Sequence, residues 1–166
     1  MKYVLKGHLS IVIGSMTGDI ARALSDIEPI RLDNLPDFLN DPEVTLDLDN
    51  PVILLNTTSN IPAVANTSLT LTSQYTSGNP VSVYVPSIDI PGSYQGTETR
   101  FSISDKTPTI WPTGYSAATT TVLTKTGSVK ELIYRIPKQV DVDVDSVRLH
   151  IEDMDITRSY NVDVNY

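Results

Sequence analysis

The sequence predicts an all-β protein, an antiparallel β-sandwich with one short N-terminal α-helix. Three observations lead to this fold class. Val, Ile and Thr together supply 50 residues whereas Ala supplies 6, and β-branched side chains are restricted in helices but pack well on pleated sheets. Apolar and polar residues alternate with a period of two through most of the chain, as in half-buried strands. Turn signals recur about every 8–12 residues, a spacing that is typical of sandwiches.

The N-terminal part is expected to contain one strand and the single helix. Alternation over residues 5–13 predicts the strand. Residues 19–27 repeat apolar side chains at i, i+3, i+4 and i+7, which predicts an amphipathic helix. Pro29 limits this helix to two or three turns. The stretch 34–39 is interpreted as a capped helical turn with proline at an early position.

After Pro42 the pattern predicts only strands and turns. A strand over 44–49 alternates apolar residues with Thr and Asp, and Asn50-Pro51 interrupts it. The Asp-rich residues 140–151 are expected to form two strands joined near Asp145-Ser146. The full set of strands after the Asn-Pro pair is expected at 52–55, 64–71, 81–85, 100–104, 119–124, 129–136, 140–144, 146–151 and 160–166.

The chain length suits a single β-sandwich domain, residues 1–166, which can bury a core without metal or disulfide support. The alternation of residues 160–166 runs to the last residue. We therefore expect this domain to be a piece of a longer exported protein that contains further domains. Because unpaired strand edges recruit partners, we also expect this last strand to be exposed and to pair with a second copy through Val162 and Val164.

Charge and composition exclude several classes of protein. The chain has 12 Lys and Arg against 20 Asp and Glu, for a net charge of −8, which argues against nucleic acid as a partner because phosphates need clustered cations. Cysteine is absent, so disulfides, thiol nucleophiles and thiolate metal sites are excluded. No stretch approaches the roughly 18 apolar residues of a membrane-spanning helix.

The acidic run 141–152 has the strongest likeness to a binding motif. It places acids at positions 1, 3, 5 and 12, as calcium loops do. However, Ser146 replaces the glycine of the sharp turn, and the alternation of Val leaves no flanking helices. We interpret the run as strands whose acids face water, and a looser calcium site that uses Asp153 or Asp155 remains an alternative.

Trp111 is the only tryptophan and lies with Tyr115 in a Pro-bounded loop, residues 108–115. Flat aromatic faces on a rigid loop stack on the C–H groups of sugars, whereas a lone Trp in a sandwich often fills the core. The sequence therefore predicts Trp111, Tyr115 and Tyr94 as ligand-binding residues for a glycan. Packing of Trp111 in the core or as a loop anchor is the competing interpretation.

No set of catalytic residues stands out. His8 and His150 lack the spacing of zinc ligands, and Ser15 lies one position too early for a nucleophile elbow. A glycosidase needs two paired acids, and the pattern does not single out such a pair. We expect a protein that is not an enzyme, with no cofactor and no metal site.

Several short stretches resemble two known families. The run 44–56 with its Asn50-Pro51, followed by Ile61-Pro62 and a Thr-rich strand, resembles β-sandwich domains of exported Bacteroidetes lipoproteins. Residues 145–147 are similar to the Asp-Ser/Thr-apolar tripeptide that is O-glycosylated in exported proteins of that phylum, and 160–166 resembles a strand that continues there into a further domain. The Asn-Pro strand with Ile-Pro is also similar to the water-stress β-sandwich of late-embryogenesis-abundant proteins. Neither resemblance implies a catalytic residue set.

These observations together predict a non-catalytic structural or binding module of a bacterial cell-surface or periplasmic protein. It would be exported and attached to the membrane only through a lipid anchor outside this chain. Its partner would be a glycan or a surface protein. The alternatives are a carbohydrate-binding module that uses the aromatic loop, a calcium-stabilised adhesion domain with its ion near Asp141–Asp155, and a hydrolase with two acids in one cleft.

Overall fold

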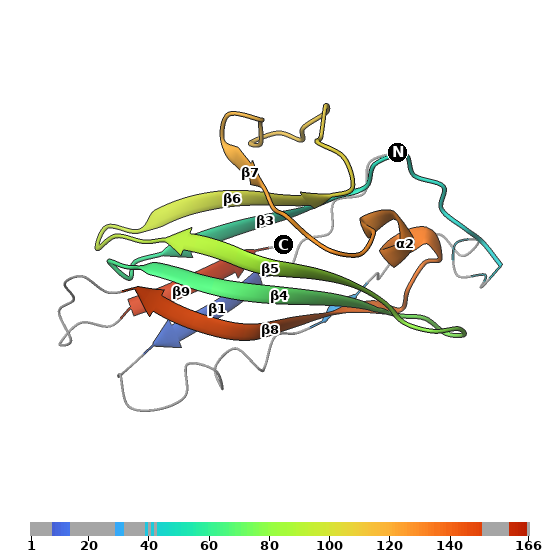
Figure 1. Cartoon of the computed structure of the whole chain (residues 1–166), viewed down its shortest axis with the longest axis horizontal. Coiled ribbons are helices and arrows are strands. Elements are labelled where there is room, and N and C mark those ends of the chain that lie inside the picture. Colours follow the sequence, from blue (N-terminus) through green and yellow to red (C-terminus); the bar gives the residue numbers. More distant parts are fainter. Residues whose placement is uncertain are drawn as a thin grey trace.

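A computed structural model describes residues 8–13, 29–31, 39, 41, 43–150 and 160–165. Within these ranges the protein is mostly β with antiparallel sheets (Figure 1), so the all-β prediction is confirmed. The helix predicted at 19–27 and residues 34–38 of the predicted helical turn lie outside the described residues. The described elements are β1 His8–Ile13, β2 Ile30–Arg31, β3 Val52–Ser59, β4 Val64–Gln74, β5 Val81–Pro91, β6 Thr97–Ser104, β7 Thr120–Val122, α2 Val129–Tyr134, β8 Gln139–His150 and β9 Tyr160–Asn165.

The strands form two sheets. A five-stranded sheet has the order β1-β9-β3-β6-β7, and a four-stranded sheet has the order β2-β8-β4-β5. Neighbouring strands are antiparallel except β6 and β7, which are parallel. The C-terminal strand β9 lies between β1 and β3, with Val162 opposite Ile11 on one side and Ser59 on the other. The expectation of an exposed C-terminal edge is therefore wrong, because two strands of the same chain already pair with β9.

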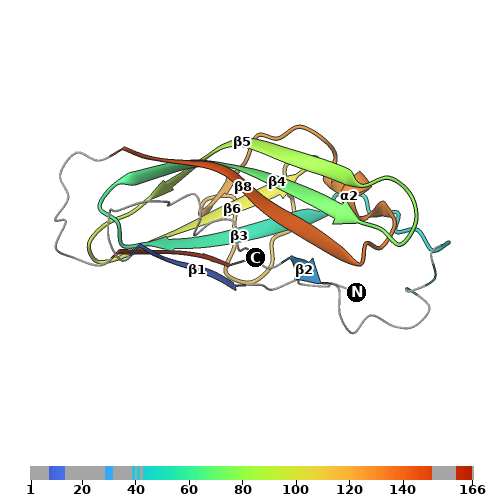
Figure 2. The same ribbon diagram turned by 90° about the horizontal axis from the view of Figure 1, so that it is seen from below.

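One hydrophobic core joins the two sheets. Figure 2 shows β4, β5 and β8 on one side of the molecule and β1 and β3 on the other. Leu55 and Phe101 of the five-stranded sheet pack in the same buried cluster as Leu71 and Val83 of the four-stranded sheet. Leu132 of α2 belongs to this cluster and is fully buried. Burial of this apolar surface is the main force that stabilises such a fold.

Two β-bulges disturb the four-stranded sheet at the same level. Between Thr67 and Leu69 of β4, the register shifts against both β5 and β8. The extra residue of β8 is Asp145, so the predicted break between two strands is wrong and corresponds to a bulge within one strand, β8. In β5 the buried positions change from odd to even numbers after Pro86, which has no N–H for the ladder.

Two further strand predictions are wrong. Residues 44–49 form no strand, and only Thr45 makes an isolated bridge, to Arg135. The stretch predicted as a strand at 129–136 begins with the helix α2. The side chain of Ser128 caps this helix by accepting a hydrogen bond from the N–H of Glu131 at 3.2 Å, a favourable arrangement at a helix start.

Candidate functional site

Two of the three predicted aromatic residues, Trp111 and Tyr115, lie in the loop 105–119, which connects β6 to β7. Because these two strands are parallel, the connecting chain must run back along β6 before β7 begins, and Figure 1 shows it beyond the edge of the five-stranded sheet. Trp111 and Tyr115 are both half-buried in this loop, whereas Ile110 is 72% exposed. The loop therefore presents a strongly exposed aliphatic side chain beside a partly covered indole.

Arg100 of β6 holds this loop in place. Its guanidinium lies 5.6 Å from the centre of the Tyr115 ring, a favourable cation–π distance. Its Nη1 donates a hydrogen bond to the carbonyl oxygen of Gly114. Its Nε and Nη2 donate to Oε1 of Glu98 at 2.9 and 2.6 Å. One face of the Tyr115 ring is thus already in contact with a cation, so that face does not serve a ligand.

The third predicted residue lies in a different segment. Tyr94 is part of the turn between β5 and β6 and is 47% exposed. This turn packs closely against the connection between β3 and β4, because a Cβ added at Gly92 would lie 2.0 Å from the carbonyl oxygen of Ile61. The structure therefore groups Trp111 with Tyr115 on one loop and places Tyr94 on another.

The acidic run adopts extended strand structure up to His150 instead of a calcium loop. Asp141 accepts hydrogen bonds from the side-chain amides of Gln74 and Gln139, both at 2.7 Å, and Asp143 is exposed. Among the described residues, no three His, Asp or Glu side chains gather closely enough to hold a metal ion. Asp153 and Asp155, the residues of the looser calcium site, lie outside the described residues.

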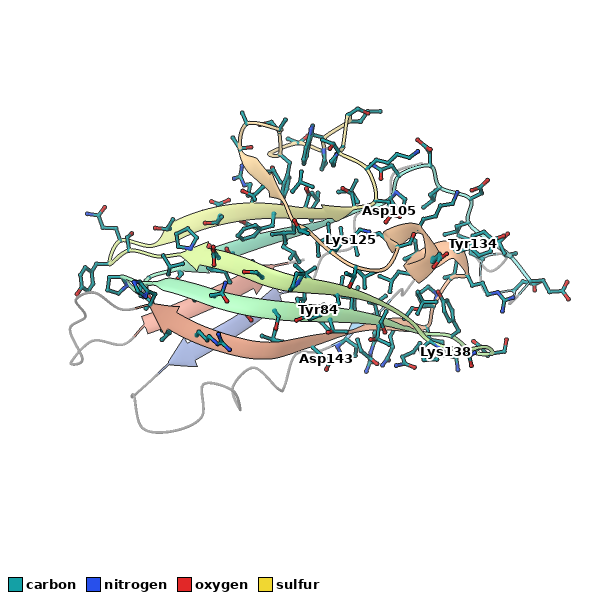
Figure 3. All side chains as sticks on the ribbon, viewed as in Figure 1. Tyr84, Asp105, Lys125, Tyr134, Lys138 and Asp143 are labelled. Atoms are coloured by element: carbon teal, nitrogen blue, oxygen red, sulfur yellow. The ribbon has the colours of Figure 1, made fainter. Side chains whose placement is uncertain are left out.

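Asp105 is a polar centre that the sequence reasoning missed. Its carboxylate accepts hydrogen bonds from the backbone N–H groups of Val129 at 3.0 Å and Lys130 at 2.9 Å, from the Ser128 hydroxyl at 2.8 Å and from Lys125 Nζ at 2.6 Å. Figure 3 shows Asp105 and Lys125 beside the start of α2. Partial burial opposes ionisation of Asp105, but these hydrogen bonds, led by Lys125, outweigh it and hold the pKa of Asp105 well below its usual range. This carboxylate joins the end of β6 to α2.

The outer face of the four-stranded sheet is the second candidate surface that the sequence reasoning missed. We define this outer face as Asn66, Thr70, Thr72 and Gln74 of β4 together with the residues that pair with them on β5 and β8. All of these side chains are half-buried or exposed, because the intervening residues of β4 point into the core. The alternation of polar residues along these three strands is visible in the sequence. Only the strand register shows that these residues lie side by side on one surface.

Comparison of the chain with protein-family models, with curated proteins and with solved structures finds no match. In the part of the chain that the structure describes, none of the helices has the length and apolar character needed to cross a membrane.

Proposed function

We propose that this chain is a non-catalytic binding module with β-sandwich architecture, part of an exported bacterial protein of the cell surface or periplasm. The two sheets share one core, which is how sandwiches bury their inner faces. The strongest polar centre, Asp105, is engaged in capping α2, which favours a structural role for this carboxylate. A binding role therefore fits the candidate surfaces better than a catalytic one.

The single observation that carries this proposal is the anchored loop 105–119. Arg100 contacts both the ring of Tyr115 and the backbone of Gly114, so the loop is held before any ligand arrives. Ile110 is 72% exposed and Trp111 is half-buried beside it. A rigid loop loses little conformational entropy on binding, which favours affinity. The ligand would be a glycan or a surface protein that contacts Trp111 and Tyr115.

The experiment uses the single tryptophan, since all indole emission arises from this loop. The emission of Trp111 is recorded while soluble neutral oligosaccharides are titrated, and the Trp111→Ala variant is compared with the wild type by isothermal calorimetry. A saturable change in emission, together with loss of binding in Trp111→Ala, would support the loop as a glycan site. Binding that Trp111→Ala leaves intact would rule the loop out as the glycan site.

A further inference from the structure

The outer face of the four-stranded sheet contains two clusters in which side-chain amides hold carboxylates. In the first, Gln74 and Gln139 both donate to Asp141 at 2.7 Å. In the second, Asn66 donates to Asp89 at 2.6 Å and to the hydroxyl of Ser87 at 2.7 Å. Each cluster therefore presents hydrogen-bond donors and acceptors that are already oriented.

An exposed aromatic side chain lies between the two clusters. Tyr84 of β5 is 40% exposed and pairs with Thr70 of β4, which pairs in turn with Asp143 of β8. Figure 3 shows Tyr84 and Asp143 on this face, and in Figure 1 no described segment passes in front of β4 or β8. Asn66 and Gln74 are eight positions apart on β4, which corresponds to about 26 Å at the rise of a strand. The clusters thus mark two ends of a long surface with Tyr84 between them.

The chemistry of this face restricts the ligand. The register places three carboxylates, Asp89, Asp141 and Asp143, and two guanidinium groups, Arg31 and Arg148, on or beside this face. A polyion of either sign therefore meets groups of its own sign there and gains little. Protein interfaces are built around apolar and aromatic side chains at their centre, whereas the cross-strand neighbours of Tyr84 on this face are the hydroxyl of Thr70 and, beyond it, the carboxylate of Asp143. An uncharged chain rich in hydroxyl groups complements this surface best.

We propose that the outer face of the four-stranded sheet binds an extended, uncharged polysaccharide. The ring of Tyr84 would stack on the C–H face of one sugar, and the two amide–carboxylate clusters would hydrogen-bond the hydroxyl groups of sugars on either side. The inference rests on the proposed function only in treating the chain as a binding module. It adds a polysaccharide-binding surface on β4, β5 and β8 that is separate from the loop 105–119.

The test is affinity electrophoresis in native gels that contain xyloglucan, galactomannan, mixed-linkage β-glucan or, as an anionic comparison, polygalacturonate. We expect at least one neutral polymer to retard the wild-type chain more strongly than polygalacturonate does. The Tyr84→Ala variant should bind that polymer roughly tenfold more weakly, which corresponds to about 1.4 kcal/mol. The double variant Asn66→Ala/Asp89→Ala should lose a similar factor while retaining Tyr84.

Tyr134→Ala is the matched control, because Tyr134 is 44% exposed but lies on α2, away from the outer face. It should bind as the wild type does, and circular dichroism of each variant verifies folding. The inference is overturned if no neutral polymer retards the chain or if Tyr134→Ala loses as much affinity as Tyr84→Ala. If only Trp111→Ala loses affinity, the outer face is excluded while the loop of the proposed function stands.

Discussion

At the scale of single residues, Asp105 shows how one carboxylate can join distant segments. It directly follows β6, yet it accepts hydrogen bonds from the first N–H groups of α2 and from the ammonium of Lys125. Hydrogen bonds to a charged group contribute more than neutral ones, and an unsatisfied buried donor costs free energy. The Asp105→Asn change should therefore lower the free energy of unfolding by about 1–3 kcal/mol, as measured by urea denaturation. Asp47→Asn is the control, because Asp47 pairs with Lys130 in an exposed ion pair, and it should change stability little.

The pH dependence of this effect has a definite sign. The pKa of Asp105 is lowered in the folded protein, so the folded state favours the ionised form. Its contribution is fully present above the unfolded-state pKa of about 3.9 and is lost progressively as the pH falls toward the folded value. The stability difference between wild type and Asp105→Asn should stay constant between about pH 5 and 7 and shrink below about pH 4. A difference that grew on acidification would contradict the assignment.

Gly127 is the position where the backbone most clearly requires glycine. Its φ is +87°, and a Cβ there would lie 2.5 Å from the carbonyl oxygen of Ser82, next to the bridge between Thr126 and Tyr84. Gly114 has a similar φ of +91° but nothing within 4 Å of its Cβ position. Both alanine variants bear the cost of the left-handed conformation, about 1 kcal/mol, but only Gly127→Ala must also displace β5. Gly127→Ala should therefore be clearly the less stable of the two in thermal unfolding, and equal melting temperatures would refute the steric argument.

At the scale of elements, the loop 105–119 depends on Arg100. Replacing Arg100 by Ala removes the ring contact to Tyr115 and the hydrogen bond to Gly114. Cation–π contacts at partly exposed sites contribute about 0.5–1 kcal/mol, so global stability should fall only slightly. Local opening of the loop should increase, and we expect faster limited proteolysis within 105–119 and a red shift of Trp111 emission. Lys130→Ala, which removes an exposed ion pair with Asp47 outside the loop, should leave both observables unchanged.

The helix α2 illustrates what local patterns can and cannot decide. Val129, Leu132, Ile133 and Ile136 have the i, i+3, i+4, i+7 spacing of a helix, and Ser128 with Glu131 has the form of a capping box. The segment was nevertheless predicted as a strand, because β-branched residues surround it and six residues are too few for a clear period. The missing information is tertiary: Asp105 supplies hydrogen-bond acceptors to its first turn from another part of the chain.

The bulges in β5 and β8 illustrate a second limit of local patterns. Both a turn and a bulge shift the alternation by one residue. The shift at Asp145 was interpreted as the boundary of two strands, whereas the uninterrupted pairing of β4 on both sides shows one strand. The spacing of apolar residues was therefore enough to predict that the segments on both sides of Asp145 are strands. The continuity of β8 depended on a partner strand that lies far away in the sequence.

At the scale of the whole molecule, the all-β class followed from composition, but the sheet order did not. The position of β9 between β1 and β3 joins residues at opposite ends of the chain, and no local signal encodes such pairing. The same holds for the candidate surfaces. Trp111 and Tyr115 could be predicted as candidate binding residues because they lie in one Pro-bounded loop. The contact of Arg100 with that loop, and the clusters around Asp141 and Asp89, join separate segments of the chain and could not be predicted without the strand register.

The whole-molecule charge leads to the last prediction, which concerns calcium. With a net charge of −8, any added cation screens repulsion and raises stability modestly, so a response to calcium alone is not diagnostic. Asp141 is bound by two amides and Asp89 by Asn66, which leaves these carboxylates poorly arranged to chelate an ion. We expect the melting temperature in calcium to equal that in magnesium at the same ionic strength, and both to match EDTA with added sodium chloride. Because a ligand of the native state must stabilise it, a calcium-specific rise of several degrees would instead show that the native state binds calcium, as the calcium-stabilised alternative requires.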